Sequence, residues 1–400
     1  MQKWVDEASK IILDNHLVIQ TESLPLHDTI GRVLMEDLFA DRDFPPYDRV
    51  TMDGIAINYE SFAAGQRSFK IAAIGAAGAE QLKLPHPSEC IEIMTGAVLP
   101  KETDTVIRYE DLQIDQQTVH IQTDKVRQGQ NIHYQGEDRT KGTKIISAGA
   151  IISPAELGVA ATIGKSHLQV ARMPKTMIIS TGDELVEIED QPAAHQIRKS
   201  NVHRILATLK SWGMQADFDH LNDDPEEIRQ RLKEIIQEYD LVLLSGGVSK
   251  GKFDYIPDAL ASLKVQKLFH RVSQRPGKPF WFGRSEERGT VVFALPGNPV
   301  SSFMCTQVYL PPWLRASMGL APSSLPYAQL AEDYHFRPDL TYFLQVKVQY
   351  QSDGSTLAYP ITGHGSGDLA NLVDADGFLE LPKGRDVYQK GEAFRYITYR

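Results

Sequence analysis

The stretch LVLLSGGVSKGKFDYIPD, residues 241–258, predicts the centre of the fold. Its first four residues are apolar, as in a strand buried on both faces, and Ser245, Gly246 and Gly247 end that strand. Asp254 then begins an expected helix. Because glycine has no Cβ, a phosphate can approach its N–H groups, and the helix points its positive end at the same place. We therefore expect an anion site beside a carboxylate, which a bridging cation would reconcile.

The segments around this stretch alternate between expected strands and helices. The pattern predicts strands over residues 176–180, 214–220, 267–272 and 290–295 and helices over residues 200–213 and 223–240. Ser200 or Asn201 suits the start of the first helix, and Asp224 and Pro225 suit the start of the second. Such alternation is typical of a doubly wound, mostly parallel sheet. The fold class is therefore a multidomain α/β plus β protein with a central doubly wound α/β domain.

The other regions are predicted to form smaller domains. Short strands with glycine turns predict a small β domain inserted into the N-terminal one, and the last part predicts a small β barrel or sandwich. A first helix is expected within residues 3–20, and residues 24–44 have a partly helical pattern. The expected domains are residues 1–44 plus 143–172 (N-terminal, helical or mixed), 45–142 (inserted, β-rich), 173–320 (α/β) and 326–400 (C-terminal β).

Composition limits the class of protein. The chain has 400 residues, which favours several domains, and its formal net charge of −10 argues against a nucleic-acid surface. No apolar run is long enough to predict a membrane span, and the first residues lack the layout of a signal peptide. Cys90 and Cys305 have no second cysteine at metal-ligand spacing. We expect a cytoplasmic protein without nucleic-acid or membrane partners.

Three loops follow predicted strands at the edge where open α/β sheets bind ligands. They are STGDEL (180–185), the SGGVSKGKFD of the opening stretch, and LPGNPVSS (295–302). One glycine-rich loop alone is as often a tight turn. Three at strand ends indicate a ligand site, with these expected contacts: Glu184, Ser245, Gly246, Gly247, Ser249, Pro296, Gly297 and Pro299.

A basic segment lies between the second and third loops. RVSQRPGKPFWF, residues 271–282, holds Arg271, Arg275 and Lys278, and its prolines stiffen the chain. In an acidic chain this segment predicts a phosphate clamp. The alternative is a solvated basic loop.

Five carboxylates stand in loops beside glycine, proline or another acid: Asp53, Asp138, Glu184, Asp223 and Asp254. Each alone is most often a turn or capping residue. Together with the basic segment they fit phosphoryl or nucleotidyl chemistry with Mg²⁺, which prefers oxygen ligands and also contacts phosphate.

Seven strings resemble those of one family. PPYDRVTMDGIA, MTGAVLP, GEDR, STGDEL, LSGGVSKGKFD, RPGKP and LPGNPVS, in this order and at these separations, resemble the MoeA-type molybdopterin molybdenumtransferase family, which is related to the C-terminal domain of gephyrin and to a plant domain. The resemblance covers nearly the whole chain.

The resemblance implies an activity and an assembly. The implied reaction takes adenylylated molybdopterin and molybdate, releases AMP and leaves molybdenum on the pterin dithiolene, with Mg²⁺. A homodimer is implied, with the N-terminal domain in dimerisation and residues 173–320 as the molybdopterin-binding domain. Molybdopterin adenylyltransferase and molybdoenzyme-maturation proteins are the implied partners.

The family's functional residues map onto this chain by motif. The implied catalytic residues are Asp53, Thr95, Asp138, Glu184 and Asp254, with Glu184 and Asp254 on the metal, and Asp223, Pro296 and Pro299 at the substrate. Arg275 stands where many members have lysine. Its planar guanidinium can bind a phosphate through two hydrogen bonds, whereas a lysine ammonium acts as a compact charge. Asp368 and Asp376 depart from the family pattern, so no site is inferred in the last domain. A gephyrin-type scaffold and a MogA-type adenylyltransferase stay open as alternatives, and the cleft acids and the N-terminal motifs favour the transferase over them.

Overall fold

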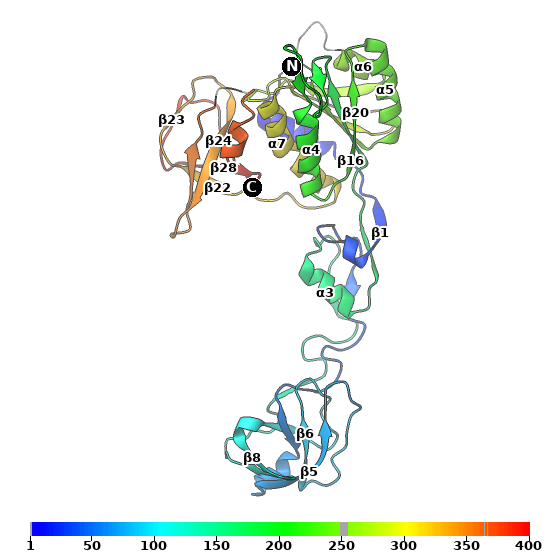
Figure 1. Cartoon of the computed structure of the whole chain (residues 1–400), viewed down its shortest axis with the longest axis vertical. Coiled ribbons are helices and arrows are strands. Elements are labelled where there is room, and N and C mark those ends of the chain that lie inside the picture. The colour runs from blue at the N-terminus through cyan, green and yellow to red at the C-terminus, as the bar shows by residue number, and fades with distance from the viewer. Residues whose placement is uncertain (1, 249–254, 364, 366) are drawn as a thin grey trace. The chain divides into compact units, whose positions relative to one another are not determined.

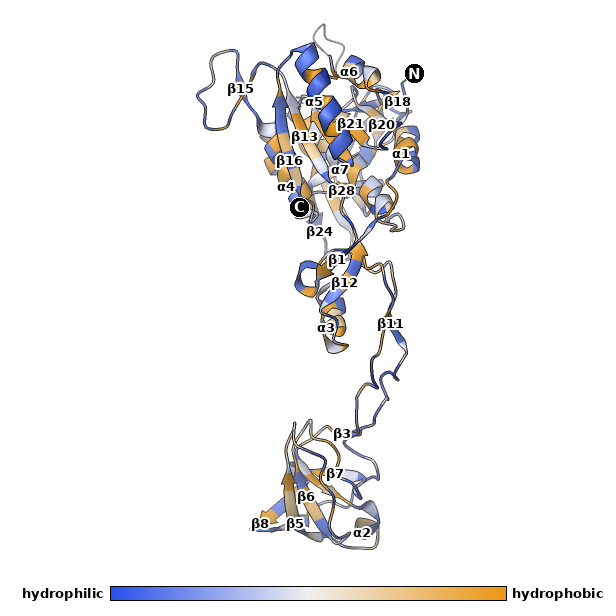
Figure 2. Cartoon of the chain, turned by 90° about the vertical axis from the view of Figure 1, so that its right-hand side faces the viewer, coloured by the Kyte–Doolittle hydropathy of each residue, from blue (hydrophilic) through white to orange (hydrophobic). Residues whose placement is uncertain are grey.

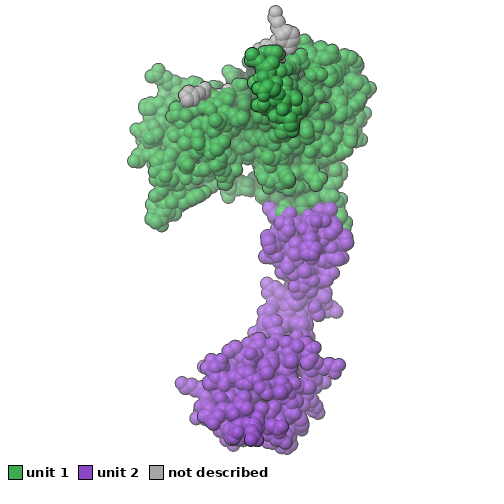
Figure 3. Space-filling view, in the orientation of Figure 1, with its two compact units in different colours: residues 1–23, 31–33, 169–400 green, residues 24–30, 34–168 purple. Residues whose placement is uncertain are grey.

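The computed structural model describes residues 2–248, 255–363, 365 and 367–400 (Figure 1). Ser249 and Asp254, two predicted site residues, lie outside this part of the chain. The chain divides into two compact units (Figure 3). Unit 1 holds residues 1–23, 31–33 and 169–400, and unit 2 holds residues 24–30 and 34–168.

A six-stranded sheet forms the centre of unit 1, in the order β16-β13-β17-β21-β20-β18 (Figure 1). Its strands are β13 (Thr176–Thr181), β16 (Ala216–Leu221), β17 (Leu241–Ser245), β18 (Val265–His270), β20 (Trp281–Ser285) and β21 (Val291–Leu295). The first four strands in that order run parallel, and β20 is antiparallel to both its neighbours. Ser180, Ser245 and Leu295 are in register, so the loops after β13, β17 and β21 leave the sheet at one edge. The predicted doubly wound, mostly parallel sheet is confirmed.

Helices cover both faces of this sheet (Figure 1). On one face α7 (Pro299–Ser317) packs against α1 (Val5–Asp14) and α4 (Ser200–Ser211), and on the other α5 (Pro225–Glu238) packs against α6 (Ile256–Ser262). Strand β21 contributes side chains to the cores on both faces of the sheet, because successive side chains of a strand point to opposite faces. Val292 and Ala294 join the core under α5 and α6, whereas Phe293 meets Trp313 of α7 edge-on at 5.6 Å. Figure 2 shows the corresponding hydropathy, with β21 in orange and much of α5 in blue.

The C-terminal part of unit 1 is a closed barrel of five strands. They are β22 (Tyr327–Leu330), β24 (Thr341–Tyr350), β25 (Thr356–Pro360), β26 (Gly377–Leu381) and β28 (Ala393–Thr398). The order is β24-β25-β22-β28-β26, and β26 pairs back with β24. A short strand of the α/β domain, β19 (Gln274–Arg275), adds to β24 in parallel. Of the two predicted forms, barrel or sandwich, the structure has the barrel.

Unit 1 also contains two pairs of short strands and a short helix. Strand β23 (Tyr334–His335) pairs with β27 (Val387–Tyr388), and β14 (Leu185–Val186) pairs with β15 (Ile197–Arg198). Helix α8 (Asn371–Asp374) precedes β26.

Unit 2 is built around a second six-stranded sheet, in the order β7-β4-β6-β5-β9-β8. Its strands are β4 (Gly54–Ile57), β5 (Ser68–Gly75), β6 (Glu89–Ile93), β7 (Thr105–Arg108), β8 (Leu112–Asp115) and β9 (Thr118–Ile121). The remaining elements of unit 2 are β2 (Leu38–Phe39) with β11 (Lys144–Ile146), β3 (Arg49–Val50) with β10 (Ile132–His133), α2 (Tyr59–Ala63), α3 (Pro154–Thr162), η1 (Leu26–Asp28) and η2 (Tyr109–Asp111). The paired strands β1 (Thr21–Pro25) and β12 (His167–Ala171) each have residues in both units.

The structure differs from the predicted local structure at two places. Residues 24–44 hold one short 3-10 helix, η1, and the two-residue strand β2, so only three residues of the partly helical segment are helical. Their backbone bonds to the returning chain, as Leu34 N–H does to the Ala150 carbonyl and Ala40 N–H to the Thr143 carbonyl. Strand β20 was missed because Gly283 interrupts its apolar run, and it was assigned to the end of the basic loop. In the described part of the chain, no helix is both long and apolar enough to cross a membrane.

The N-cap of α5 gives a first testable prediction. Asp224 accepts hydrogen bonds from the N–H groups of Glu226 (2.9 Å) and Glu227 (2.8 Å). We expect Asp224→Ala to lower the free energy of unfolding of unit 1 by about 1 kcal/mol, because these helix N–H groups lose their acceptor. Urea denaturation followed by circular dichroism measures it. Asp224→Asn is the control and should keep most of the stability, and an equal loss in both variants would contradict a capping role.

Candidate functional site

A pocket of about 490 Å³ lies where the three parallel strands end. The loops after β13, β17 and β21 line it, together with the start of α4. It brings together these predicted residues: Glu184, Asp223, Ser245, Gly246, Gly247, Pro296, Gly297 and Pro299. We call it the glycine pocket. The loops meet because their strands are adjacent and parallel, as the sequence indicated.

Two glycines allow the close packing of this pocket. Gly246 has φ +107° and Gly247 has φ +67°, where other residues are strained. A Cβ on Gly246 would come within 2.9 Å of the Thr181 hydroxyl oxygen, and one on Gly247 within 2.7 Å of Ile256 Cγ1. Only glycine fits at either position, which leaves the loop backbone accessible to an anion.

Asn201 joins two of the three loops. Its side-chain amide donates to the Ser245 hydroxyl (2.9 Å) and to the Gly297 carbonyl (2.6 Å). The Arg204 guanidinium in turn donates to the Asn201 side-chain oxygen (2.9 Å) and to the Pro299 carbonyl (2.8 Å). Burial lowers the pKa of Arg204 to about 10, so it is still charged at neutral pH. These hydrogen bonds hold the loops after β17 and β21 at a fixed separation.

The sequence did not assign this role to either residue. Asn201 was expected only as a possible helix cap, but the N-cap of α4 is Lys199, without a side-chain cap bond. An asparagine at the start of a helix that faces two glycine loops was the available signal. Arg204 gave none, because an arginine inside an amphipathic helix is usually solvated.

Two carboxylates line the glycine pocket, Glu184 and Asp223. Their loops are connected, because the Asp223 N–H donates to the Asp183 carboxylate at 2.9 Å. Among the described residues no group of three or more metal-binding side chains occurs. A Mg²⁺ that binds one or two carboxylates and completes its shell with phosphate and water needs no such group. Glu184 and Asp223 therefore fit the oxygen donors that Mg²⁺ requires.

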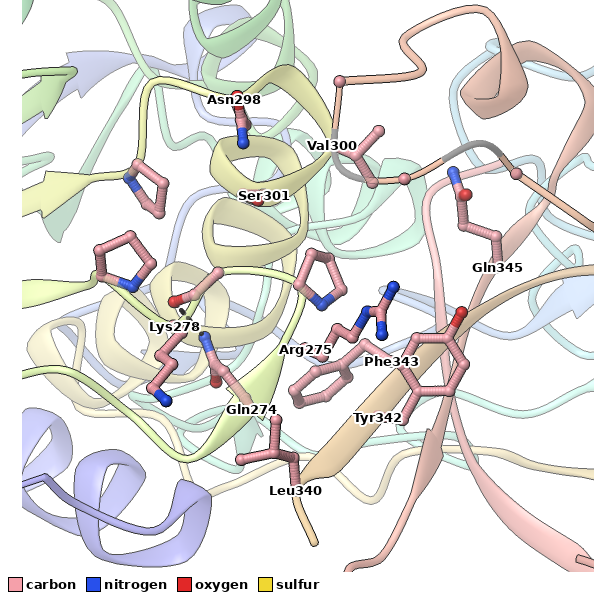
Figure 4. A pocket seen from close by; sticks show the side chains of 17 residues that line it. Gln274, Arg275, Lys278, Asn298, Val300, Ser301, Leu340, Tyr342, Phe343 and Gln345 are labelled. Carbon is pink, nitrogen blue, oxygen red and sulfur yellow. Dashed lines mark hydrogen bonds between the residues drawn. The ribbon is translucent and has the colours of Figure 1, made fainter. Parts of the chain in front are cut away.

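A second pocket, of about 610 Å³, lies beside the first (Figure 4). Its walls come from the RPGKP segment, the start of α7 and the C-terminal barrel, which contributes Tyr342 and Phe343. Pro279, Pro296 and Asn298 line both pockets, so the two share a wall. We call it the basic pocket because Arg275 and Lys278 line it.

The predicted phosphate clamp therefore does not line the glycine pocket. The pairing of β19 with β24 directs Arg275 to the barrel, where its guanidinium lies 5.8 Å from the centre of the Phe336 ring. In Figure 4 the guanidinium is drawn beside the Tyr342 ring. Arg271 is among the lining residues of neither pocket. The sequence had assigned no site to the barrel, and a two-residue strand that crosses between domains has no sequence pattern of its own.

The other predicted catalytic residues lie in unit 2. Asp53 accepts a hydrogen bond from the Thr95 N–H at 2.6 Å, which holds the pKa of that carboxyl below its usual value. Asp53 is therefore ionised at neutral pH. Asp138 lies 3.0 Å from His133 Nε2 in the loop after β10. The structure thus brings Asp53 and Thr95 together, and Asp138 contacts a histidine that the sequence had not paired with it.

These features define a multidomain protein with a glycine-lined pocket at the strand ends of its α/β domain, the edge where sheets of this kind bind ligands. Three family models match consecutive parts of the chain: the MoeA N-terminal region (domain I and II) over residues 4–164, a probable molybdopterin binding domain over residues 177–316, and the MoeA C-terminal region (domain IV) over residues 327–399. The chain belongs to the MoeA family, as its motifs predicted.

Full-length relatives agree. A Synechocystis protein named molybdopterin molybdenumtransferase is 39% identical over 379 residues, covering 94% of this chain and 95% of that protein. A protein of the same name from Staphylococcus epidermidis is 31% identical over 395 residues, covering 97% and 93%. The crystal structure of a molybdopterin biosynthesis MoeA protein from Pyrococcus horikoshii matches with 27% identity and a TM-score of 0.82 over the whole of both chains.

Proposed function

We propose that this chain is a molybdopterin molybdenumtransferase of molybdenum cofactor biosynthesis. It takes adenylylated molybdopterin and molybdate, releases AMP and yields molybdenum cofactor. The observation that carries the proposal is the pair of adjoining pockets, one fitted to phosphate and one basic, in a chain 39% identical to a molybdenumtransferase over 94% of its length.

The two pockets suit the two substrates. The glycine pocket offers backbone N–H groups and hydroxyls to the phosphoanhydride of adenylylated molybdopterin. The basic pocket has Arg275, Lys278 and Ser301 for an oxyanion such as molybdate. Because Pro296 and Asn298 belong to both walls, an anhydride in one pocket and an oxyanion in the other would be neighbours. Substrates held side by side react without the entropy cost of an encounter.

We assign Mg²⁺ to the carboxylates of the glycine pocket. Glu184 and Asp223 line it, and the motif comparison adds Asp254. Mg²⁺ would supply charge neutralisation at the bridging phosphate oxygens. The chain's own contribution is to orient the anhydride on the Gly246–Gly247 backbone and to leave the phosphorus open to attack from the side of the basic pocket.

Each of the two pockets argues against one of the two alternatives. An adenylyltransferase built on the α/β domain alone has no use for a pocket that the barrel completes with Tyr342 and Phe343. A scaffold has no use for a pocket that holds Glu184 and Asp223 beside a glycine loop. A reaction between two anionic substrates, one bound in each pocket, accounts for both pockets.

The test measures the reaction itself. The purified chain is given adenylylated molybdopterin, Mg²⁺ and molybdate, and AMP release and reconstitution of an apo-molybdoenzyme are followed. We expect both, with one AMP for each cofactor formed. Production of adenylylated molybdopterin from ATP and molybdopterin, without AMP release, would support the adenylyltransferase instead. If the chain shows neither activity, the result supports the non-enzymatic scaffold.

We further propose that the chain acts as a homodimer in which unit 2 of one subunit completes the site of its partner. Asp53 and Asp138 lie in unit 2 and Glu184 in unit 1. In dimers mixed from Asp53→Ala and Asp254→Ala subunits, one of the two sites would then be intact, so about half of the wild-type activity should return. The AMP-release assay on co-purified, differently tagged subunits measures it. No recovery in any mixture would contradict the shared site.

A further inference from the structure

The glycine pocket needs a side-chain cation in addition to the proposed Mg²⁺, and the basic segment does not provide it. Its ligand is a polyanion, and the charge of a Mg²⁺ there would already be offset by the Glu184 and Asp223 carboxylates. Arg275 and Lys278 line the adjoining pocket instead. Among the described residues that line the glycine pocket, the cations are Arg198 and Lys199. Arg198 is exposed, and its Nε donates to the Asp190 carbonyl at 3.1 Å.

Lys199 is held at the pocket by its backbone and by one carboxylate. Its N–H donates to the Val186 carbonyl, and its side chain is only 9% exposed. Its ammonium donates to Glu187 at 2.5 Å. An ammonium has three donors, and Glu187 takes one of them. Glu187 is 52% exposed and is not a lining residue of the pocket.

The same pocket holds a buried hydroxyl, that of Thr181, for which the described residues offer no hydrogen-bond partner. Thr181, 5% exposed, ends β13. Its hydroxyl oxygen finds no hydrogen-bond partner in the described part of the chain. That oxygen is within 2.9 Å and 3.0 Å of the positions a Cβ would take on Gly246 and Gly247, so it faces the loop expected to hold the phosphate. A buried hydroxyl without a partner is costly unless a ligand supplies one.

We infer that Lys199 and Thr181 complete the phosphate site of the glycine pocket. A phosphate oxygen of adenylylated molybdopterin would take the Lys199 ammonium from Glu187 and accept a hydrogen bond from the Thr181 hydroxyl. Glu187 is then the resting partner that keeps the ammonium ordered and can turn to solvent when the ligand binds. The inference rests on the proposed function and adds the cation of its substrate site.

The alternative is that the Lys199–Glu187 pair only fixes the chain between β14 and α4. The two accounts differ at Glu187. If the pair is structural, removing either partner damages the pocket equally. If Lys199 binds phosphate, removing the Glu187 charge eliminates a competitor and leaves the cation in place.

The experiment measures binding of adenylylated molybdopterin to the full chain without molybdate and with EDTA, so that turnover is prevented. We expect Lys199→Met to weaken binding about 10- to 100-fold, the range of one charge-assisted hydrogen bond. Lys199→Arg should recover part of the loss, and Thr181→Val should weaken binding about 5-fold, as for a neutral hydrogen bond. Glu187→Gln should bind as tightly as wild type or more tightly.

Two results would overturn the inference: wild-type affinity in Lys199→Met, or equal weakening in Lys199→Met and Glu187→Gln. If Lys199→Met does not fold, Glu187→Gln alone decides, because only the structural account predicts that it loses affinity. Thermal melting of each variant accompanies the titration. AMP release by the wild-type chain, measured separately with Mg²⁺ and molybdate, tests the proposed function, so the failure of one is distinguishable from the failure of the other.

Discussion

Glu184→Gln is expected to lower the rate of AMP release at least about 100-fold, the upper range for groups that only support a metal site. Glu184 lines the glycine pocket next to the loop proposed to hold the phosphoanhydride. The amide keeps the size of the side chain and removes the charge that a Mg²⁺ requires. We also expect the variant to need more Mg²⁺ for half-maximal activity, which a Mg²⁺ titration of the AMP-release assay measures.

The matched control for this variant is Glu189→Gln. Glu189 stands five residues later, is exposed and lines neither pocket. It carries the same change of charge, so it should keep wild-type activity and the wild-type Mg²⁺ requirement. A small effect of Glu184→Gln, or the same loss in both variants, would remove Glu184 from the metal site.

Gly246→Ala should weaken substrate binding about 100-fold or more, because the phosphate loses charged hydrogen bonds to the loop. At φ +107° an alanine is strained, and its Cβ would lie 2.9 Å from the Thr181 hydroxyl and 3.1 Å from the Thr181 carbonyl oxygen. The loop must shift, and the methyl group enters the space for the anion. Titration with adenylylated molybdopterin measures the loss.

Gly213→Ala is the control that shows how much of the effect of Gly246→Ala comes from backbone strain alone. Gly213 also has a positive φ, +75°, but a Cβ there meets nothing within 4 Å, and it lies at the end of α4, outside both pockets. Each variant should lose about 1–3 kcal/mol of stability from strain. Only Gly246→Ala should lose substrate affinity. Equal affinities in the two variants would contradict phosphate binding at the loop.

The strand ends were predictable because their signals are local. A buried apolar run that stops at Ser-Gly-Gly defines both a strand and its end, and parallel strands bring such ends to one edge. Three loops with that pattern were enough to place Glu184, Ser245 and Gly297 in one pocket before the structure was known.

Two cations of the basic segment, Arg275 and Lys278, line the pocket that adjoins the glycine pocket, and this position depends on a contact between domains. Residues 271–282 lie between two of the glycine loops in sequence, so proximity in the chain suggested proximity in space. The pairing of β19 with β24 instead directs Arg275 to the barrel. No periodicity within two residues can predict such a pairing. The sequence therefore assigned Arg275, Lys278 and Pro296 to the substrate without separating the second pocket from the first.

The polar residues that hold the pocket together were also missed. Asn201 and Arg204 lie on α4, which the sequence predicted as a helix of the α/β domain without a role at the site. Their partners are the Ser245 hydroxyl and the carbonyls of Gly297 and Pro299, which are distant in the chain. Lys199 was overlooked for the same reason. Its burial arises from the loops around it and not from its own neighbours in sequence.

The location of the substrate's phosphates tests the central claim most directly. A crystal structure of the Glu184→Gln chain with adenylylated molybdopterin would show them, because the slow variant preserves the ligand. We predict the phosphoanhydride on the backbone of Gly246 and Gly247, with the pterin side of the ligand directed toward the wall shared with the basic pocket. Phosphates bound in the basic pocket, or outside both pockets, would contradict the account.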